Sequence, residues 1–183
     1  EKEYAESGSW EAGLELCWCY LQDGRISKGI TLAVDIEKKL PPEKEAEHDG
    51  LMAKLYIEEA EYGDAAYMAE VWEKALEKKI ETDETEEERE KDLDRIRQSH
   101  LIRMQCNRGL GYANKENFTK AIAEAEKVEI GTSKDIGVLL EKAQIYMEME
   151  EYEKSLELVQ RLVEDYQIYA AYATSLEVYR RQW

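Results

Sequence analysis

"GYANKENFTKAIAEAEK" occupies residues 111–127, and "IYMEMEEYEKSLELVQR" follows it 34 residues later, at 145–161. Tyr112 aligns with Tyr146, and Phe118 aligns with Tyr152. A self-similarity of 34 residues is the period of one helix–turn–helix unit in a helical repeat protein. The two stretches therefore indicate two copies of one structural unit.

The composition favours helices along the whole chain. The 183 residues include only 2 prolines and 10 glycines, and Glu, Lys, Leu and Ala dominate. These four are strong helix formers, and no stretch sustains the period-two alternation of a strand. The sequence therefore predicts an all-α protein, long enough for one domain or a short repeat array.

Extending the pattern along the chain gives four units, at about 10–43, 49–82, 102–135 and 136–169. Gly24 and Gly63 fall in the turns of the first two units. An acidic insertion at about 83–101 and a C-terminal helix at about 170–182 complete a single domain over 1–183. The C-terminal helix either covers the last apolar face or belongs to a longer array.

The acidic insertion predicts a helix start. Thr85 and Glu88 have capping-box spacing, and Leu93, Ile96 and Leu101 follow at helical intervals. We expect a loop around 81–84 and then one long first helix of the third unit, from about 85 to 113. The charge run is read by default as a solvated helix end; a docking site for a basic segment is the alternative.

These features resemble the tetratricopeptide repeat (TPR) family over about three quarters of the chain. The resemblance implies a right-handed α-α superhelix (a TPR-like solenoid) with a C-terminal capping helix; an ordinary helical bundle is the alternative. The family's small residue of the first helix matches Cys17, Gly109 and Ala143, and its aromatic three residues on matches Tyr20, Tyr112 and Tyr146. The second unit departs from this pattern, with Tyr56, Glu59, Ala65 and Met68 where small or aromatic residues are expected.

In this family the first helices of successive units line a concave binding face. Carried over, that face holds Leu14, Trp18, Leu21, Lys54, Ile57, Arg103, Asn107, Leu110, Asn114, Leu140, Gln144 and Met147. Lys54, Arg103 and Asn107 only faintly resemble the clamp that some members use for chaperone tails. We expect instead a peptide or helical segment with apolar side chains and basic flanks. Trp18 is either an anchor for that ligand or part of the packing between units.

Charge narrows the choice of partner. The 42 acidic and 25 basic residues give a net charge of −17. Such a surface repels nucleic acid and anionic membranes and attracts basic partners. No apolar run approaches the roughly 20 residues that span a bilayer. Three cysteines without a framework spacing indicate free thiols, and hence a reducing, cytoplasmic location.

No catalytic pattern stands out. His48 and His100 lie far apart, and Cys17 and Cys19 point about 200° apart around a helix, which does not suit one metal. The sequence therefore predicts no enzyme activity, cofactor or metal. The predicted function is a protein-interaction scaffold or adaptor within a larger assembly. The alternatives are a dedicated chaperone or targeting co-factor for a secreted or membrane-bound client, and a non-catalytic fragment of a regulatory enzyme or sensor.

Overall fold

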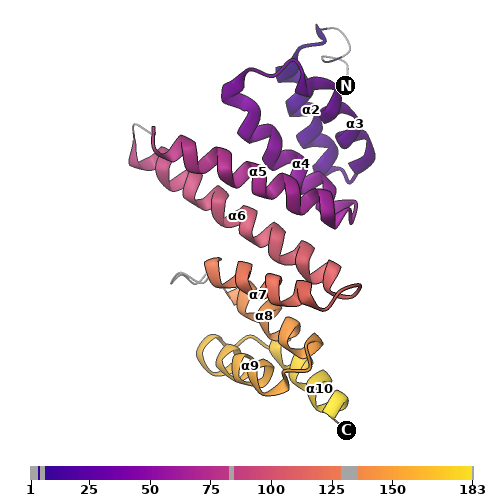
Figure 1. Cartoon of the computed structure of the whole chain (residues 1–183), viewed down its shortest axis with the longest axis vertical. Coiled ribbons are helices and arrows are strands. Elements are labelled where there is room, and N and C mark those ends of the chain that lie inside the picture. The colour runs from indigo at the N-terminus through magenta and orange to yellow at the C-terminus, as the bar shows by residue number, and fades with distance from the viewer. Residues whose placement is uncertain (1–3, 5–6, 83–84, 129–135, 183) are drawn as a thin grey trace. The chain divides into compact units, whose positions relative to one another are not determined.

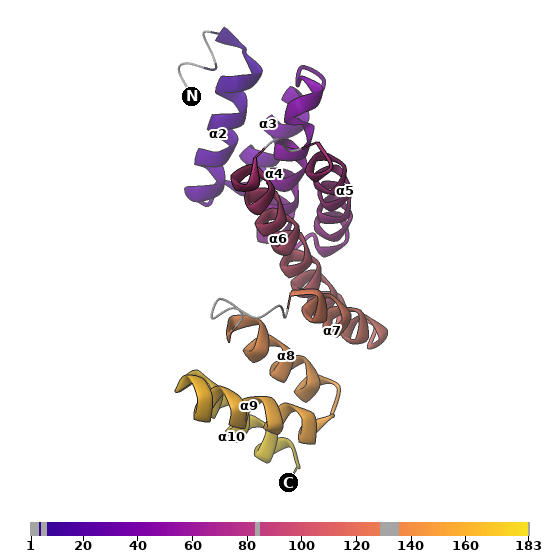
Figure 2. The ribbon, with the colours of Figure 1, turned by 90° about the vertical axis from the view of Figure 1, so that its left-hand side faces the viewer.

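The structure is a computed structural model that describes residues 4, 7–82, 85–128 and 136–182. Within these ranges every regular element is helical, so the all-α prediction is confirmed (Figure 1, Figure 2). The helices are α2 (Trp10–Gln22), α3 (Ile26–Glu37), the short 3₁₀ turn η1 (Pro42–Lys44), α4 (Glu45–Glu58), α5 (Tyr62–Ile80), α6 (Glu86–Gly111), α7 (Glu116–Val128), α8 (Ile136–Glu148), α9 (Tyr152–Tyr166) and α10 (Ala170–Gln182).

Residue contacts divide the chain into two compact units, Glu1–Cys106 and Asn107–Trp183, with the boundary inside α6. Each unit is described by itself. The prediction of a single domain stays a prediction. The predicted border between the third and fourth repeats, at 135–136, begins outside the described residues.

Unit 1 is built from two helical hairpins, α2–α3 and α4–α5, followed by most of α6. The two hairpins share a core in which Cys17 and Ile36 meet Leu51 and Leu55 of α4. Cys17 is fully buried, and its thiol lies 3.6 Å from the Gly29 carbonyl oxygen. Burial raises the pKa of Cys17 to about 12, so this thiol behaves as a small packing residue.

His48 links the two hairpins of unit 1. Its Nε2 lies 3.0 Å from the Ala33 carbonyl oxygen of α3, and its Nδ1 lies 3.8 Å from a carboxylate oxygen of Asp49. Burial by itself lowers the pKa of His48, but Asp49 and the Ala33 carbonyl outweigh that effect, so the net shift is upward. His48 is therefore a buried polar group with a partner for each ring nitrogen.

Unit 2 repeats the same kind of packing. The Ser155 hydroxyl of α9 is buried and donates to the Ala143 carbonyl of α8 at 2.7 Å. Helix α10 packs against α9, and the two lie side by side in both ribbon views. Gly111 also marks a close approach, because a Cβ placed there would lie 2.4 Å from the Phe118 ring. Small residues at these points let the helices of unit 2 come close together.

Three hairpins turn in the same way. In each, one residue has a positive φ: Gly24 (68°), Ala60 (61°) and Glu150 (65°). The N–H of the following residue donates to a tyrosine carbonyl five residues earlier, on Tyr20, Tyr56 or Tyr146. This is the Schellman ending of a helix. The α6–α7 turn differs, since the side chain of Asn114 accepts the Glu116 N–H at 3.1 Å.

The shared turn relates the first two hairpins by 36 residues, whereas the predicted repeat starts at 10 and 49 differ by 39. Tyr56 closes the second turn as Tyr20 closes the first. Ala53, Tyr62 and Ala65 then correspond to Cys17, Ile26 and Gly29. The repeat bounds themselves stay a prediction. Gly63, expected in the turn, is instead the second residue of α5. The residue with the left-handed conformation is Ala60. Alanine does not favour a positive φ, so the sequence does not predict a turn at this position.

The long helix across the acidic insertion matches its prediction. Helix α6 begins one residue after Thr85, whose hydroxyl accepts the Glu88 N–H at 3.2 Å and donates to the Glu88 carboxylate at 2.8 Å. It packs antiparallel to α5, since Asp92 meets Lys79 and Arg103 meets Glu73. Of the predicted loop at 81–84, residues 83 and 84 lie outside the described residues.

Candidate functional site

Two of the predicted binding residues meet in one pocket of unit 1. Trp18 of α2 and Lys54 of α4 line a pocket of about 240 Å³, which we call the Lys54 pocket. Trp72 of α5 and Arg95 and Gln98 of α6 line it as well. Its remaining lining residues are Ala46, Glu47 and Gly50 of α4. Four helices of unit 1, α2, α4, α5 and α6, therefore contribute to this pocket.

The Lys54 ammonium is held by neutral partners. It lies 5.1 Å from the centroid of the Trp18 ring and 5.5 Å from that of Trp72, and it donates to Gln98 Oε1 at 3.1 Å. No ion pair joins Lys54 to a carboxylate within the ranges that the structure describes. Burial lowers the pKa of Lys54, and the positive charge of Arg95 lowers it further, against the opposing effect of Asp94.

Trp72 is buried beside this ammonium because of a glycine. Only 4% of its surface is exposed. A Cβ on Gly50 would lie 2.5 Å from the Trp72 ring, far inside normal contact distance. The absence of a side chain at position 50 therefore lets the indole of α5 reach through to the pocket lined by α4.

Arg95 is fixed by a buried carboxylate. Its guanidinium donates to Asp92 at 2.7 Å, and Asp92 also bonds the Lys79 ammonium. The Asp92 side chain is 1% exposed. A shallow hollow shares Arg95 and Gln98 with the pocket and is lined further by Glu87, Glu90, Lys91 and Asp94. The pocket thus has a cationic interior and an acidic rim along α6.

The other predicted residues of unit 1 lie outside this pocket. Leu14 is 4% exposed and belongs to the core shared by the hairpins, and Leu21 packs against that core. Ile57 packs against the cluster that contains Trp72. Arg103 bonds Glu73 of α5, which also lies 3.6 Å from His100 Nδ1, so its guanidinium is engaged between α5 and α6.

The predicted residues of unit 2 belong to a separate body. Asn107 and Leu110 are half-buried near the end of α6, and Asn114 is exposed in the turn that follows. Leu140 packs against the core of α8, α9 and α10. Gln144 is half-buried and Met147 is 7% exposed. A binding role for any of these residues stays a prediction.

Sequence reasoning missed six of the eight lining residues, among them Trp72, Arg95 and Gln98. Arg95 and Gln98 come from α6, and Trp72 comes from α5. A signal existed for the two residues of α6, because residues 91, 94, 95 and 98 form one face of a helix that was expected to begin near 85. They were assigned to an insertion, and the face was read only from Arg103 onward. Trp72 had no comparable signal, since it lies in a second helix and reaches the pocket only past Gly50.

Among the described residues, no group of three or more His, Cys, Asp or Glu side chains is arranged to hold a metal ion. None of the described helices combines the length and the apolar character needed to cross a bilayer. No family model and no curated protein matches the sequence.

Proposed function

We propose that this chain is a non-catalytic protein-binding module, a TPR-like helical repeat that binds a segment of a partner protein at the Lys54 pocket. One observation carries the proposal: a half-buried ammonium between two indole rings has only neutral partners. An ammonium has three N–H donors, and Gln98 accepts one of them. An oxygen acceptor from a partner would complete its hydrogen bonds and offset the cost of burying the charge.

The hairpin geometry supports the resemblance on which the proposal rests. Three hairpins share one turn, and the tyrosine carbonyls that close it are equivalent in all three. Small residues occupy the helix crossings, as Cys17 and Ala53 do in unit 1. Repeats of this kind stack their first helices along one face, where ligands bind between them.

The size of the pocket favours a side chain over a small molecule. Drug-sized ligands occupy pockets of about 300–1,000 Å³, and this one has about 240 Å³. A partner segment would place one apolar side chain against Trp18 and an oxygen at Lys54. Basic residues flanking that side chain would meet Glu87, Glu90 and Asp94 on the rim.

The test uses peptides selected from a random display library against the wild-type protein. Lys54→Met keeps most of the apolar stem and removes the charge. Lys74→Met is the matched control, because Lys74 is exposed on α5 and pairs only locally, with Glu70. A hydrogen bond to a charged group contributes about 1.5–3 kcal/mol. We therefore expect Lys54→Met to weaken peptide binding about tenfold or more, with no change for Lys74→Met.

The indole N–H signals report where the peptide binds. The chain has four tryptophans, and Trp18→Phe and Trp72→Phe assign two of their NMR signals. Binding at the pocket should move the signals of Trp18 and Trp72 and leave that of Trp10 in place. Selected peptides that bind Lys54→Met as tightly as wild type would contradict the proposal, as would a library that yields no binder. Melting curves of both lysine variants show whether each is folded.

A further inference from the structure

Two cations line the Lys54 pocket, the Lys54 ammonium of α4 and the Arg95 guanidinium of α6. Burial is the main cause of the lowered pKa of Lys54, and the charge of Arg95 is the second. Like charges repel, so holding both in a pocket of about 240 Å³ is unfavourable. An anion bound between the two cations would replace this repulsion by attraction.

Both cations keep hydrogen-bond donors for such a group. An ammonium has three N–H donors, and a guanidinium has five. Within the described residues, Lys54 donates one hydrogen bond, to Gln98, and Arg95 donates one, to Asp92. The Asp92 side chain is 1% exposed and does not line the pocket, so it anchors Arg95 without filling the space. Two donors of Lys54 and four of Arg95 therefore remain for a bound group.

The side chains at the pocket and their partners carry an excess of two positive charges. Glu47 also lines the pocket, and its carboxylate lies 2.8 Å from the Lys44 ammonium, which neutralises it. Asp92 balances only one of its two partners, Lys79 and Arg95. With the ammonium of the pocket itself, four cations therefore meet two carboxylates. This local excess contrasts with the net charge of −17 on the whole chain.

A phosphate monoester matches this excess better than a carboxylate does. A phosphorylated side chain carries a charge of about −1.5 to −2 at pH 7 and three strong acceptor oxygens. A carboxylate carries a single negative charge, so it would leave one of the two cations without a counter-charge. The rings of Trp18 and Trp72 line the same pocket, and attraction between opposite charges is stronger beside apolar walls than in water.

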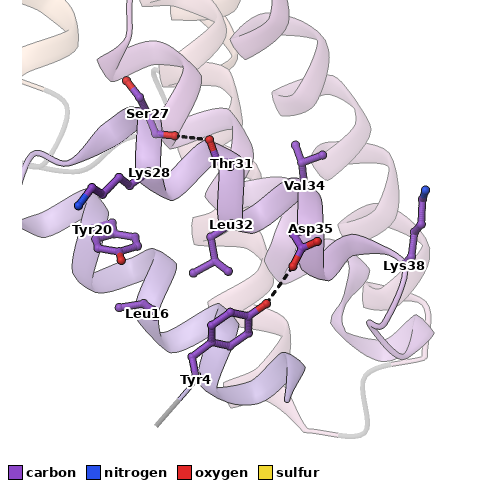
Figure 3. Close-up of a pocket in the computed structure, with 10 residues that line it drawn as sticks. All are labelled: Tyr4, Leu16, Tyr20, Ser27, Lys28, Thr31, Leu32, Val34, Asp35 and Lys38. Atoms are coloured by element: carbon purple, nitrogen blue, oxygen red, sulfur yellow. Dashed lines mark hydrogen bonds between the residues drawn. The ribbon is translucent and has the colours of Figure 1, made fainter. Parts of the chain in front are cut away.

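The larger hollow of unit 1 does not bring cations together in this way. It has about 840 Å³, lies on α2 and α3, and already holds the ring of Tyr4 (Figure 3). The Tyr4 hydroxyl donates to Asp35 at 3.0 Å. Lys28 and Lys38 lie on opposite sides of this hollow, with Asp35 between them (Figure 3). Of these two hollows, the Lys54 pocket is the one that suits an anion.

We propose that the Lys54 pocket binds a phosphorylated side chain of the partner segment, with the phosphate oxygens between the Lys54 ammonium and the Arg95 guanidinium. This inference rests on the proposed function, because it names the group that enters the same pocket. Arg95 orients the phosphate, since a planar guanidinium can donate to two of its oxygens at once. Basic residues on either side of the phosphorylated residue meet the acidic rim and offset the repulsion by the charge of the chain.

The test begins with a peptide array that has a central phosphoserine between random flanking residues. Each peptide that binds is made again with serine or with glutamate at the central place, and fluorescence anisotropy gives the Kd of all three forms. A hydrogen bond to a charged group is stronger than one between neutral groups, and the phosphate gains several. We therefore expect the phosphorylated form to bind about tenfold or more tighter than the serine form, and also tighter than the glutamate form.

The variant Arg95→Gln separates a role in phosphate binding from a structural role. We expect it to weaken the phosphorylated form about tenfold and the serine form less than about twofold, whereas a loss of structure would weaken both forms equally. Lys91→Gln is the matched control, because Lys91 lies one turn earlier on α6, outside the pocket, and bonds Glu87. Melting curves show whether each variant is folded. Gln98→Glu, which places a carboxylate beside Lys54, replaces Arg95→Gln if that variant does not fold.

The outcomes distinguish this inference from the proposed function. Equal affinity for the phosphorylated and serine forms would overturn the inference, and so would a glutamate form that binds as tightly as the phosphorylated one. If Lys54→Met still weakens those peptides, the proposed function stands without the phosphate. An array without binders, beside a random library that yields peptides dependent on Lys54, would also overturn the phosphate alone. The absence of binders from both screens would overturn both proposals.

Discussion

The register of the second hairpin can be tested by exchanging two residue types, with Ala60→Gly and Gly63→Ala. Ala60 has a φ of 61°, a left-handed conformation that costs an L-residue about 1–2 kcal/mol. Glycine removes this strain but loses about 0.4–1 kcal/mol through the greater freedom of the unfolded chain. We therefore expect Ala60→Gly to stabilise unit 1 by about 0.5–1 kcal/mol.

Gly63 should respond in the same direction to the opposite change. It is helical, and a Cβ placed on it meets no atom within 4 Å. Replacing glycine by alanine in a helix gains up to about 1 kcal/mol. If the turn lay at Gly63, as the sequence pattern indicated, alanine there would instead cost about 1 kcal/mol. The two registers therefore predict opposite signs for the same substitution.

Thermal unfolding followed by circular dichroism measures both effects. A change of 1 kcal/mol moves the melting temperature of a 60–100-residue domain by about 4–8 °C, well above the error of a melting curve. Gly24→Ala gives the reference, because Gly24 has a φ of 68° in the equivalent turn and should lose about 1 kcal/mol. Destabilisation by both Ala60→Gly and Gly63→Ala would refute the register and with it the shared turn.

Three further predictions concern packing, thiols and pH. Gly50→Ala should destabilise the protein by about 1–3 kcal/mol, because its Cβ would lie 2.5 Å from the Trp72 ring; a melting temperature equal to that of wild type would contradict this. Ellman's reagent should titrate one thiol, Cys19, in the native protein and three in urea, because the other two cysteines are buried with pKa values raised to about 12. The folded-state pKa of His48 lies above the reference value of 6.5, so protonated His48 contributes stability that is complete below the unfolded pKa and is lost as pH rises through the folded pKa. Relative to His48→Gln, wild type should lose free energy of unfolding as the pH rises above the reference pKa of 6.5, and parallel curves would contradict the role of Asp49.

The sequence predicted the helix boundaries well where a local pattern occurs in only one structural context. Thr85 and Glu88 marked the start of α6 because a hydroxyl at that spacing satisfies a free N–H of the first turn. The turn of the α4–α5 hairpin was placed wrongly because glycine occurs both in left-handed turns and inside helices. Gly24 occupies a left-handed turn, whereas Gly63 lies in a helix and Ala60 makes the turn. Ala53 and Ala65 are both fully buried in one core cluster, which fits a turn at Ala60.

The candidate site could be predicted only in part, for a related reason. Trp18 and Lys54 were predicted from the repeat pattern, and the structure brings both of them to one pocket. Arg95 and Gln98 were missed because residues added to a repeat were taken to lie outside its binding face. A helix extended at its N-terminus continues the same face, however, so four extra turns carry that face further along. The acidic residues of α6 are thus part of the rim of the pocket.

Spacing and residue character also do not distinguish a buried position from one that lines a hollow. Leu16 and Met52 lie 36 residues apart and hold corresponding places in their hairpins. Met52 is 4% exposed and belongs to the core shared by the two hairpins, whereas Leu16 is half-buried and lines a hollow on α2 and α3. Burial depends on which elements pack against a position, and the pattern of a single helix does not specify its neighbours.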